Sequence, residues 1–93
     1  MLMSSDAPAV EITQNVKSIL IGVLELSIAA DEIADDEPLY SAVLPLDSLS
    51  TLKLIAALEE RFSIRVEDDV ILENGFDTVA NLVAIVVCSL RAT

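Results

Sequence analysis

Apolar residues recur every three or four positions in three separate segments of this chain, and that spacing predicts helices. The segments run from Val10 to Ala29, from Asp47 to Phe62 and from Val79 to Leu90. Each is preceded by residues that favour a helix start, either a proline or the N-cap residues Asp, Ser and Thr. Three amphipathic helices in a chain of 93 residues bury their apolar faces against one another, which predicts a small all-α bundle.

The rest of the chain is predicted to form one short helix and two connections. Val70 to Asn74 is expected to make a brief helical turn, because the Asn-Gly pair that follows favours a helix end. Asp31 to Leu46 contains a proline and is predicted to be a long connection, and Ser63 to Asp69 a short loop. The expected fold is therefore a four-helix bundle with three longer helices and one short helix.

The same spacing predicts the domain limits and the residues of the core. One domain is expected over residues 10–90, with a flexible segment at 1–9 and a tail at 91–93. The core stripe expected on the second helix consists of Leu52, Ile55, Leu58 and Phe62, with Leu54 beside it. The buried side expected on the last helix consists of Val79, Leu82, Val83, Val86, Val87 and Leu90.

Charge and composition exclude several classes of function. The chain has 5 Lys and Arg against 16 Asp and Glu, a formal net charge of −11. This balance argues against binding to nucleic acid, which needs a basic face, and against docking on an anionic membrane. The single cysteine, Cys88, excludes an intramolecular disulfide and a thiolate zinc cluster, so we expect a cytoplasmic, reducing location. A monomer is the expectation for this size and charge.

The sequence lacks the residues of two common catalytic arrangements. There is no histidine to act as a base beside a nucleophile, and two glycines cannot form a glycine-rich phosphate loop. The acidic residues do not follow the ligand spacing of a calcium loop, because a count from Asp31 places Ile33 at the third position and Asp36 where glycine is required. The chain is predicted not to be an enzyme and to hold no specific metal ion.

The most informative motif is Leu46-Asp47-Ser48-Leu49, where the long connection meets the second helix. One interpretation is an ordinary N-cap, in which Asp or Ser satisfies the free backbone N–H groups of the first turn. The other is that the Ser48 hydroxyl is an attachment point for a phosphodiester, which a helix N-terminus stabilises. Such a site needs no base in this chain, because a separate enzyme can supply the chemistry.

From Val10 to Leu90 the sequence resembles the acyl carrier proteins, which carry phosphopantetheine in fatty acid, polyketide and nonribosomal peptide synthesis. The resemblance depends on Asp47-Ser48-Leu49, on Leu58-Glu59-Glu60-Arg61-Phe62, and on Phe76 to Leu82 at the start of the last helix. It implies an acyl-carrier-like fold in which Ser48 carries a 4′-phosphopantetheine arm, donated from coenzyme A by a phosphopantetheinyl transferase. Asp47 would lie beside the arm.

The resemblance also implies a surface for partner enzymes. Its residues would be Leu49, Leu52, Lys53, Ala56, Glu59 and Glu60. The partners would be the transferase, an enzyme that loads acyl or aminoacyl groups as thioesters, and downstream synthase or transferase enzymes. From the residues alone, Leu52 can also be interpreted as a core residue. Glu59 and Glu60 can equally be interpreted as part of an ordinary solvated helix face.

The sequence departs from the family pattern near the serine. Pro45 and Leu46 stand where a glycine is common, and Lys53 replaces an acidic residue that is frequent in fatty-acid carriers. The Leu-Asp-Ser-Leu form looks more like carriers of specialised polyketide or nonribosomal pathways than like a fatty-acid carrier. The alternative function is a non-enzymatic, acidic helical interaction domain in which Ser48 is only a helix cap.

Overall fold

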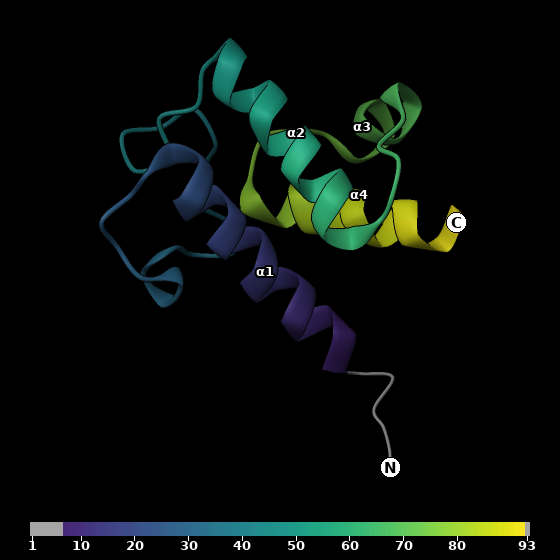
Figure 1. Ribbon diagram of the computed structural model, residues 1–93, viewed down its shortest axis with the longest axis horizontal. Coiled ribbons are helices and arrows are strands. Elements are labelled where there is room, and N and C mark those ends of the chain that lie inside the picture. Colours follow the sequence, from purple (N-terminus) through teal and green to yellow (C-terminus); the bar gives the residue numbers. More distant parts are fainter. Residues whose placement is uncertain (1–6, 93) are drawn as a thin grey trace.

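The computed structural model describes residues 7–92, with side chains from Val10 onward. Its elements are α1 (Ala7–Leu24), a short 3₁₀ helix η1 (Ala30–Glu32), α2 (Ser48–Phe62), α3 (Asp68–Asn74) and α4 (Val79–Ala92). Apart from an isolated bridge between Pro38 and Thr78, this part of the chain contains no β-structure. The prediction of a small all-α bundle with three longer helices and one short helix is confirmed (Figure 1).

The first helix is displaced from its predicted position. It ends at Leu24 and not at Ala29, because Glu25 adopts a left-handed conformation with φ 54°. The N–H of Leu26 then donates to the carbonyl of Ile21 at 3.0 Å, which satisfies one of the last carbonyls of the helix. Residues 25–29 therefore join the connection to α2, which is longer than the sequence indicates.

The other helix ends differ from the predictions by a few residues. The predicted turn at Val70 begins at Asp68, and α4 continues to Ala92. The helices therefore extend into both predicted flanking segments, since α1 includes residues 7–9 and α4 includes 91 and 92. Residues 1–6 and 93 of those segments lie outside the described part of the chain. No helix within 7–92 is long and apolar enough to cross a bilayer.

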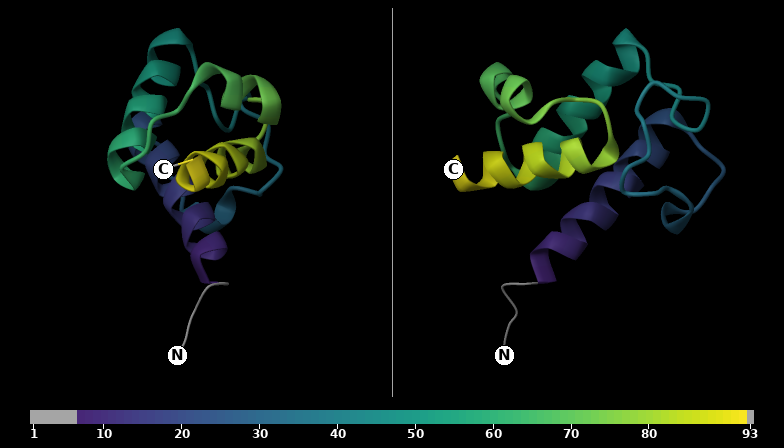
Figure 2. Two further views of the ribbon diagram at one scale, coloured as in Figure 1. Left: turned by 90° about the vertical axis from the view of Figure 1, so that its right-hand side faces the viewer. Right: turned by 180° about the vertical axis from the view of Figure 1, so that it is seen from behind.

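The core lies where α1, α2 and α4 meet. α1 packs against both α2 and α4, and α3 packs on α4 on the far side from α1 (Figures 1 and 2). The interior is aliphatic, and its fully buried side chains include Val16, Leu20, Leu54, Leu58, Leu82 and Val86. The start of α2 lies at the opposite end of the molecule from the start of α1 (Figure 1).

The predicted stripe on α2 is wrong at one position. Leu54 and Leu58 are buried against the core, while Leu52 is 67% exposed. Leu52 and Leu54 lie two residues apart, about 200° around a helix, so the two side chains project from opposite faces. Periodicity alone does not decide between two apolar faces, and packing of α2 against α1 and α4 selects the face that contains Leu54.

The buried side of α4 also differs from the prediction. Ile85 and Ser89 are buried there, whereas Leu90 is 39% exposed, and Val83 and Val87 are only partly buried. The buried face of α4 is therefore centred closer to Ile85 than the sequence predicts. The reason is that α4 packs against three helices, α1, α2 and α3.

The long connection between α1 and α2 is fixed to the start of α4. The carbonyl oxygens of Glu37 and Asp35 accept the N–H groups of Val79 and Ala80, at 3.1 and 2.8 Å. These are among the first N–H groups of α4, which have no partner inside the helix. The side chain of Asp35 also pairs with the buried Lys17 of α1 at 2.7 Å. The segment that leads to the start of α2 is thereby tied to two other helices.

Candidate functional site

Ser48 is the first residue of α2, and its side chain is exposed. The chain reaches it through Leu44 and Leu46, which are buried at 0% and 7% exposure. These two leucines fix the end of the connection in the core, while the residues between and after them turn outward. The result is a hydroxyl presented to solvent on a fixed backbone.

Asp47 is the N-cap of α2. One of its oxygens, Oδ1, accepts hydrogen bonds from the N–H of Ser50 at 2.8 Å and from the Ser50 hydroxyl at 2.6 Å. The hydroxyl of Ser50, and next its N–H, hold the pKa of Asp47 below its ordinary value of 3.8. The sequence prediction of a capped helix start at this position is confirmed, and Asp47 is a carboxylate at neutral pH.

The position of Ser48 suits a phosphodiester. The first N–H groups of a helix have no intrahelical partner, and the helix dipole adds partial positive charge at the same end. A phosphate on the Ser48 oxygen would lie at this end of a helix of 15 residues. The exposed serine therefore fits an attached anionic group without any change in the core.

Five of the six residues predicted for partner docking lie together on α2. Leu49 and Leu52 are 62% and 67% exposed, and the side chains of Lys53, Ala56 and Glu60 are also exposed. Their spacing along the helix places all five on one face. The alternative reading of Leu52 as a core residue is wrong.

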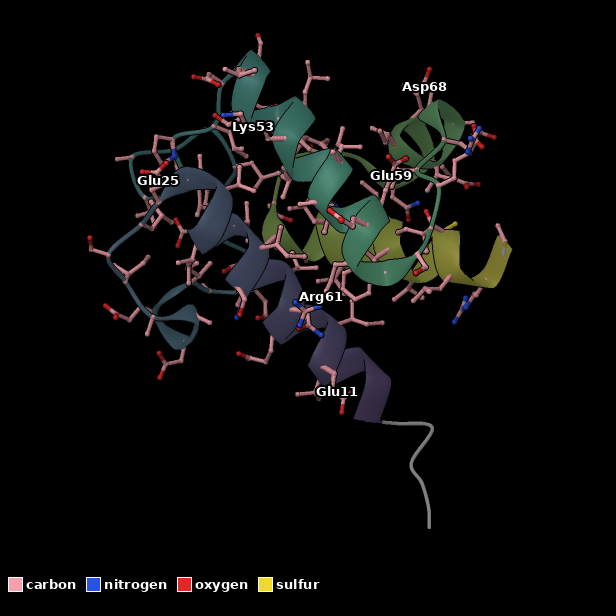
Figure 3. The ribbon with its side chains drawn as sticks, viewed as in Figure 1. Glu11, Glu25, Lys53, Glu59, Arg61 and Asp68 are labelled. Carbon is pink, nitrogen blue, oxygen red and sulfur yellow. The ribbon has the colours of Figure 1, made fainter. Side chains whose placement is uncertain are left out.

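Glu59 has a different environment from the other five. Its Oε2 accepts the backbone N–H of Val66 at 2.9 Å, and both residues are half-buried. Figure 3 shows Glu59 on the side of α2 that faces α3, with Lys53 on the opposite side. Its carboxylate therefore holds the connection between α2 and α3 in place.

Tyr40 is a residue near the site that the sequence alone did not place there. Its hydroxyl is hydrogen-bonded to Thr51 Oγ1 at 2.9 Å, and its ring centroid lies 6.4 Å from that of Phe76. The backbone of Tyr40 has φ 60°, an unusual conformation for a bulky residue. An aromatic side chain in a long connection gives no signal in the sequence of a contact with a helix eleven residues further on. The contact fixes this part of the connection one turn beyond Ser48.

A cavity of about 230 Å³ lies away from these residues. It opens between α1, the long connection and α4, and Thr13, Asp35, Ala80 and Val83 line it. None of the predicted site residues borders it. Within residues 7–92, no group of three or more His, Cys, Asp or Glu side chains is close enough to hold a metal ion.

A comparison with protein families gives a match over most of the chain. The model of the family described as "Phosphopantetheine attachment site" matches residues 14–86. The match covers most of the chain and includes the end of the long connection, all of α2 and the exposed serine at its start.

Proposed function

The chain belongs to the phosphopantetheine attachment-site family, and we propose that it is a carrier protein with its arm on Ser48. The prosthetic group of the family is 4′-phosphopantetheine. The observation that carries the proposal is the exposed Ser48 hydroxyl at the N-terminus of α2, inside the matched region. The carrier itself needs no catalytic residues, because a phosphopantetheinyl transferase moves the arm from coenzyme A to the serine.

The residues around Ser48 have separate roles in this proposal. Ser48 supplies the oxygen that forms the phosphodiester, and the N-terminus of α2 stabilises its negative charge. Asp47 holds the first turn of α2 through Ser50 and adds a carboxylate beside the serine. The buried Leu44 and Leu46 keep the serine at a fixed position while a partner enzyme approaches.

The proposed arm supplies a thiol on which acyl or aminoacyl groups are held as thioesters. A tethered acyl group reaches a high effective concentration at each partner active site in turn. We place the protein in a polyketide or nonribosomal type of pathway, and the support for this is the Leu46-Asp47-Ser48-Leu49 sequence together with Lys53 on α2. The partners in this proposal are the transferase, a loading enzyme and downstream synthases. We also propose a reducing, cytoplasmic location, and the support for this is that Cys88 is the single cysteine of the chain.

The intact mass of the protein tests this proposal. The folded protein is incubated with coenzyme A, magnesium and a broad-specificity phosphopantetheinyl transferase. We expect a gain of one phosphopantetheine on the wild type and none on Ser48→Ala. The matched comparison is Ser50→Ala, which removes the hydroxyl that bonds to Asp47 but keeps the Ser48 hydroxyl and the Ser50 N–H, and it should still gain the arm.

Two results would contradict the carrier proposal. If the folded wild type gains no mass, the bonds that Ser50 donates to Asp47 serve only as a helix cap, and the acidic interaction domain becomes the better account. If Ser48→Ala gains the arm, the attachment site lies elsewhere in the chain.

A further inference from the structure

Tyr40 has an unusual backbone conformation next to the start of α2. Its φ of 60° lies in the left-handed region, which bulky residues rarely adopt. The residue before it, Leu39, is buried in the core. The hydroxyl of the residue after it, Ser41, donates to the Pro38 carbonyl at 2.8 Å and accepts the Leu44 N–H at 3.1 Å. The neighbours on both sides therefore hold Tyr40 in this conformation, and residues held in this way cluster at ligand-binding and other functional sites.

This conformation places an aromatic side chain at the surface of the protein. The chain has one tyrosine, two phenylalanines and no tryptophan, yet Tyr40 is 53% exposed. Its ring lies beside that of Phe76, and its hydroxyl is 2.9 Å from Thr51 Oγ1. Thr51 follows Ser48 by three residues, so the two side chains are neighbours on the surface of α2. Packing in the core therefore does not account for the position of Tyr40, which lies close to the attachment serine instead.

The hydroxyls of Tyr40 and Thr51 carry one proton more than the bond between them uses. Each hydroxyl has one proton to donate and can also accept. The two groups share one hydrogen bond, and neither has another hydrogen-bond partner in the described part of the chain. The phenol of Tyr40 is the more acidic group and the better donor, which leaves the Thr51 proton for another acceptor. A hydroxyl that accepts a hydrogen bond is also polarised into a stronger donor.

The charges around Ser48 favour the side of α2 on which Thr51 lies. The proposed arm joins Ser48 through a phosphodiester, which adds a negative charge close to the Asp47 carboxylate. That carboxylate is bonded to Ser50, which lies on nearly the opposite side of the helix from Ser48. Thr51 lies only about 60° around the helix from Ser48. Repulsion from Asp47 therefore turns the phosphate toward the Thr51 hydroxyl.

We propose that the Thr51 hydroxyl donates a hydrogen bond to the phosphate of the arm, and that Tyr40 positions and polarises that hydroxyl. This inference depends on the proposed attachment at Ser48 and adds two residues that hold the arm. The Tyr40 ring also gives an apolar surface to the two methyl groups that follow the phosphate in 4′-phosphopantetheine. The arm then leaves Ser48 in one direction, and the thiol moves from a fixed base.

Nuclear magnetic resonance of the arm-bearing protein tests this proposal. Tyr40 is the only tyrosine of the chain, so ¹³C-labelled tyrosine gives ring signals from this residue alone. A transferase loads the labelled protein from coenzyme A, and the intact mass confirms that the arm is present. Nuclear Overhauser effects between the Tyr40 ring protons and the two methyl groups of the arm then show whether they are in contact. Spectra recorded before loading show that each variant is folded.

We expect these Overhauser effects in the loaded wild type. Thr51→Val keeps the shape of the side chain without the hydroxyl, and it should lower their intensity about tenfold, because one hydrogen bond to a charged group is lost. Thr51→Ser keeps a hydroxyl and should retain most of the intensity. Tyr40→Phe, followed with labelled phenylalanine, should lower it about two- to threefold through the loss of polarisation. The matched control is Lys53→Gln, which removes the positive charge of the same helix end and should stay within about twofold of the wild type.

Three results would overturn this proposal. Loaded wild type without Overhauser effects between Tyr40 and the arm would show that the two are not in contact. Equal intensities in the wild type and Thr51→Val would show that the Thr51 hydroxyl does not hold the phosphate. Intensities that fall in Lys53→Gln but not in Thr51→Val would assign that role to Lys53. Failure of the transferase to load the wild type is seen in the intact mass, before any spectrum of the arm, and counts against the carrier function instead.

Discussion

Replacing Glu59 by alanine removes the carboxylate that holds the connection between α2 and α3. Its Oε2 accepts the Val66 N–H at 2.9 Å, and hydrogen bonds to charged groups contribute about 1.5–3 kcal/mol. Val66 is half-buried, so water replaces part of the lost bond. We therefore expect the free energy of unfolding to fall by about 1–2 kcal/mol. For a domain of this size that lowers Tm by roughly 5–15 °C.

The neighbouring residue provides the control. Glu60→Ala changes the formal charge by the same one unit, but the Glu60 side chain is exposed. Its free energy of unfolding should stay within about 0.5 kcal/mol of the wild type. Glu59→Gln keeps an acceptor oxygen without the charge and should fall between the two. Thermal and urea unfolding followed by circular dichroism measure all three. Equal losses for Glu59→Ala and Glu60→Ala would refute the structural role of Glu59.

Three further predictions concern the cap, the core and the buried charge. Because the folded pKa of Asp47 is lowered, its stabilising effect is present above pH 3.8 and is lost as the pH falls through the folded pKa. The Tm of Asp47→Asn should therefore fall less between pH 6 and pH 3 than the Tm of the wild type does. An equal fall in the two proteins would contradict this. Leu54→Ala should lower the free energy of unfolding, measured in urea, by about 2–5 kcal/mol, and Leu52→Ala, at an exposed position, by less than about 0.5 kcal/mol. The reverse order would show that the other face of α2 is buried. Lys17→Met should stay within about 1 kcal/mol of the wild type, because methionine suits the buried position of Lys17 and the Asp35 side chain, 75% exposed, remains solvated without its partner. Asp35→Ala leaves the Lys17 ammonium unpaired and should unfold at lower urea than Lys17→Met; the opposite order would count against the ion pair.

The parts of the fold that the sequence predicts are those that depend on local chemistry. Asp47 caps α2 within its own first turn, so the start of that helix follows from neighbouring residues. The end of α1 was misplaced because apolar residues continue beyond Leu24 at nearly helical spacing. Only the left-handed turn at Glu25 interrupts the helix there, and glutamate gives no signal for such a turn.

The parts that the sequence does not predict depend on contacts between distant residues. Leu52 and Leu54 are the same residue type and differ in which one is buried in the core. The bond from Val66 to Glu59 requires the chain to reverse at Ser63, which has φ 54°. The bond between Tyr40 and Thr51 joins a connection to a helix across eleven residues. The face of α2 beside Ser48 was predicted as a set of six residues, and the structure separates Glu59 from the other five.

The position of the arm is the central claim, and fragmentation mass spectrometry of the protein purified from its own cells tests it most directly. The account predicts phosphopantetheine on the peptide that contains Ser48, with fragment ions that place it on that residue. Unmodified Ser48 in the native protein, or an arm located on Ser50 or another serine, would contradict the account.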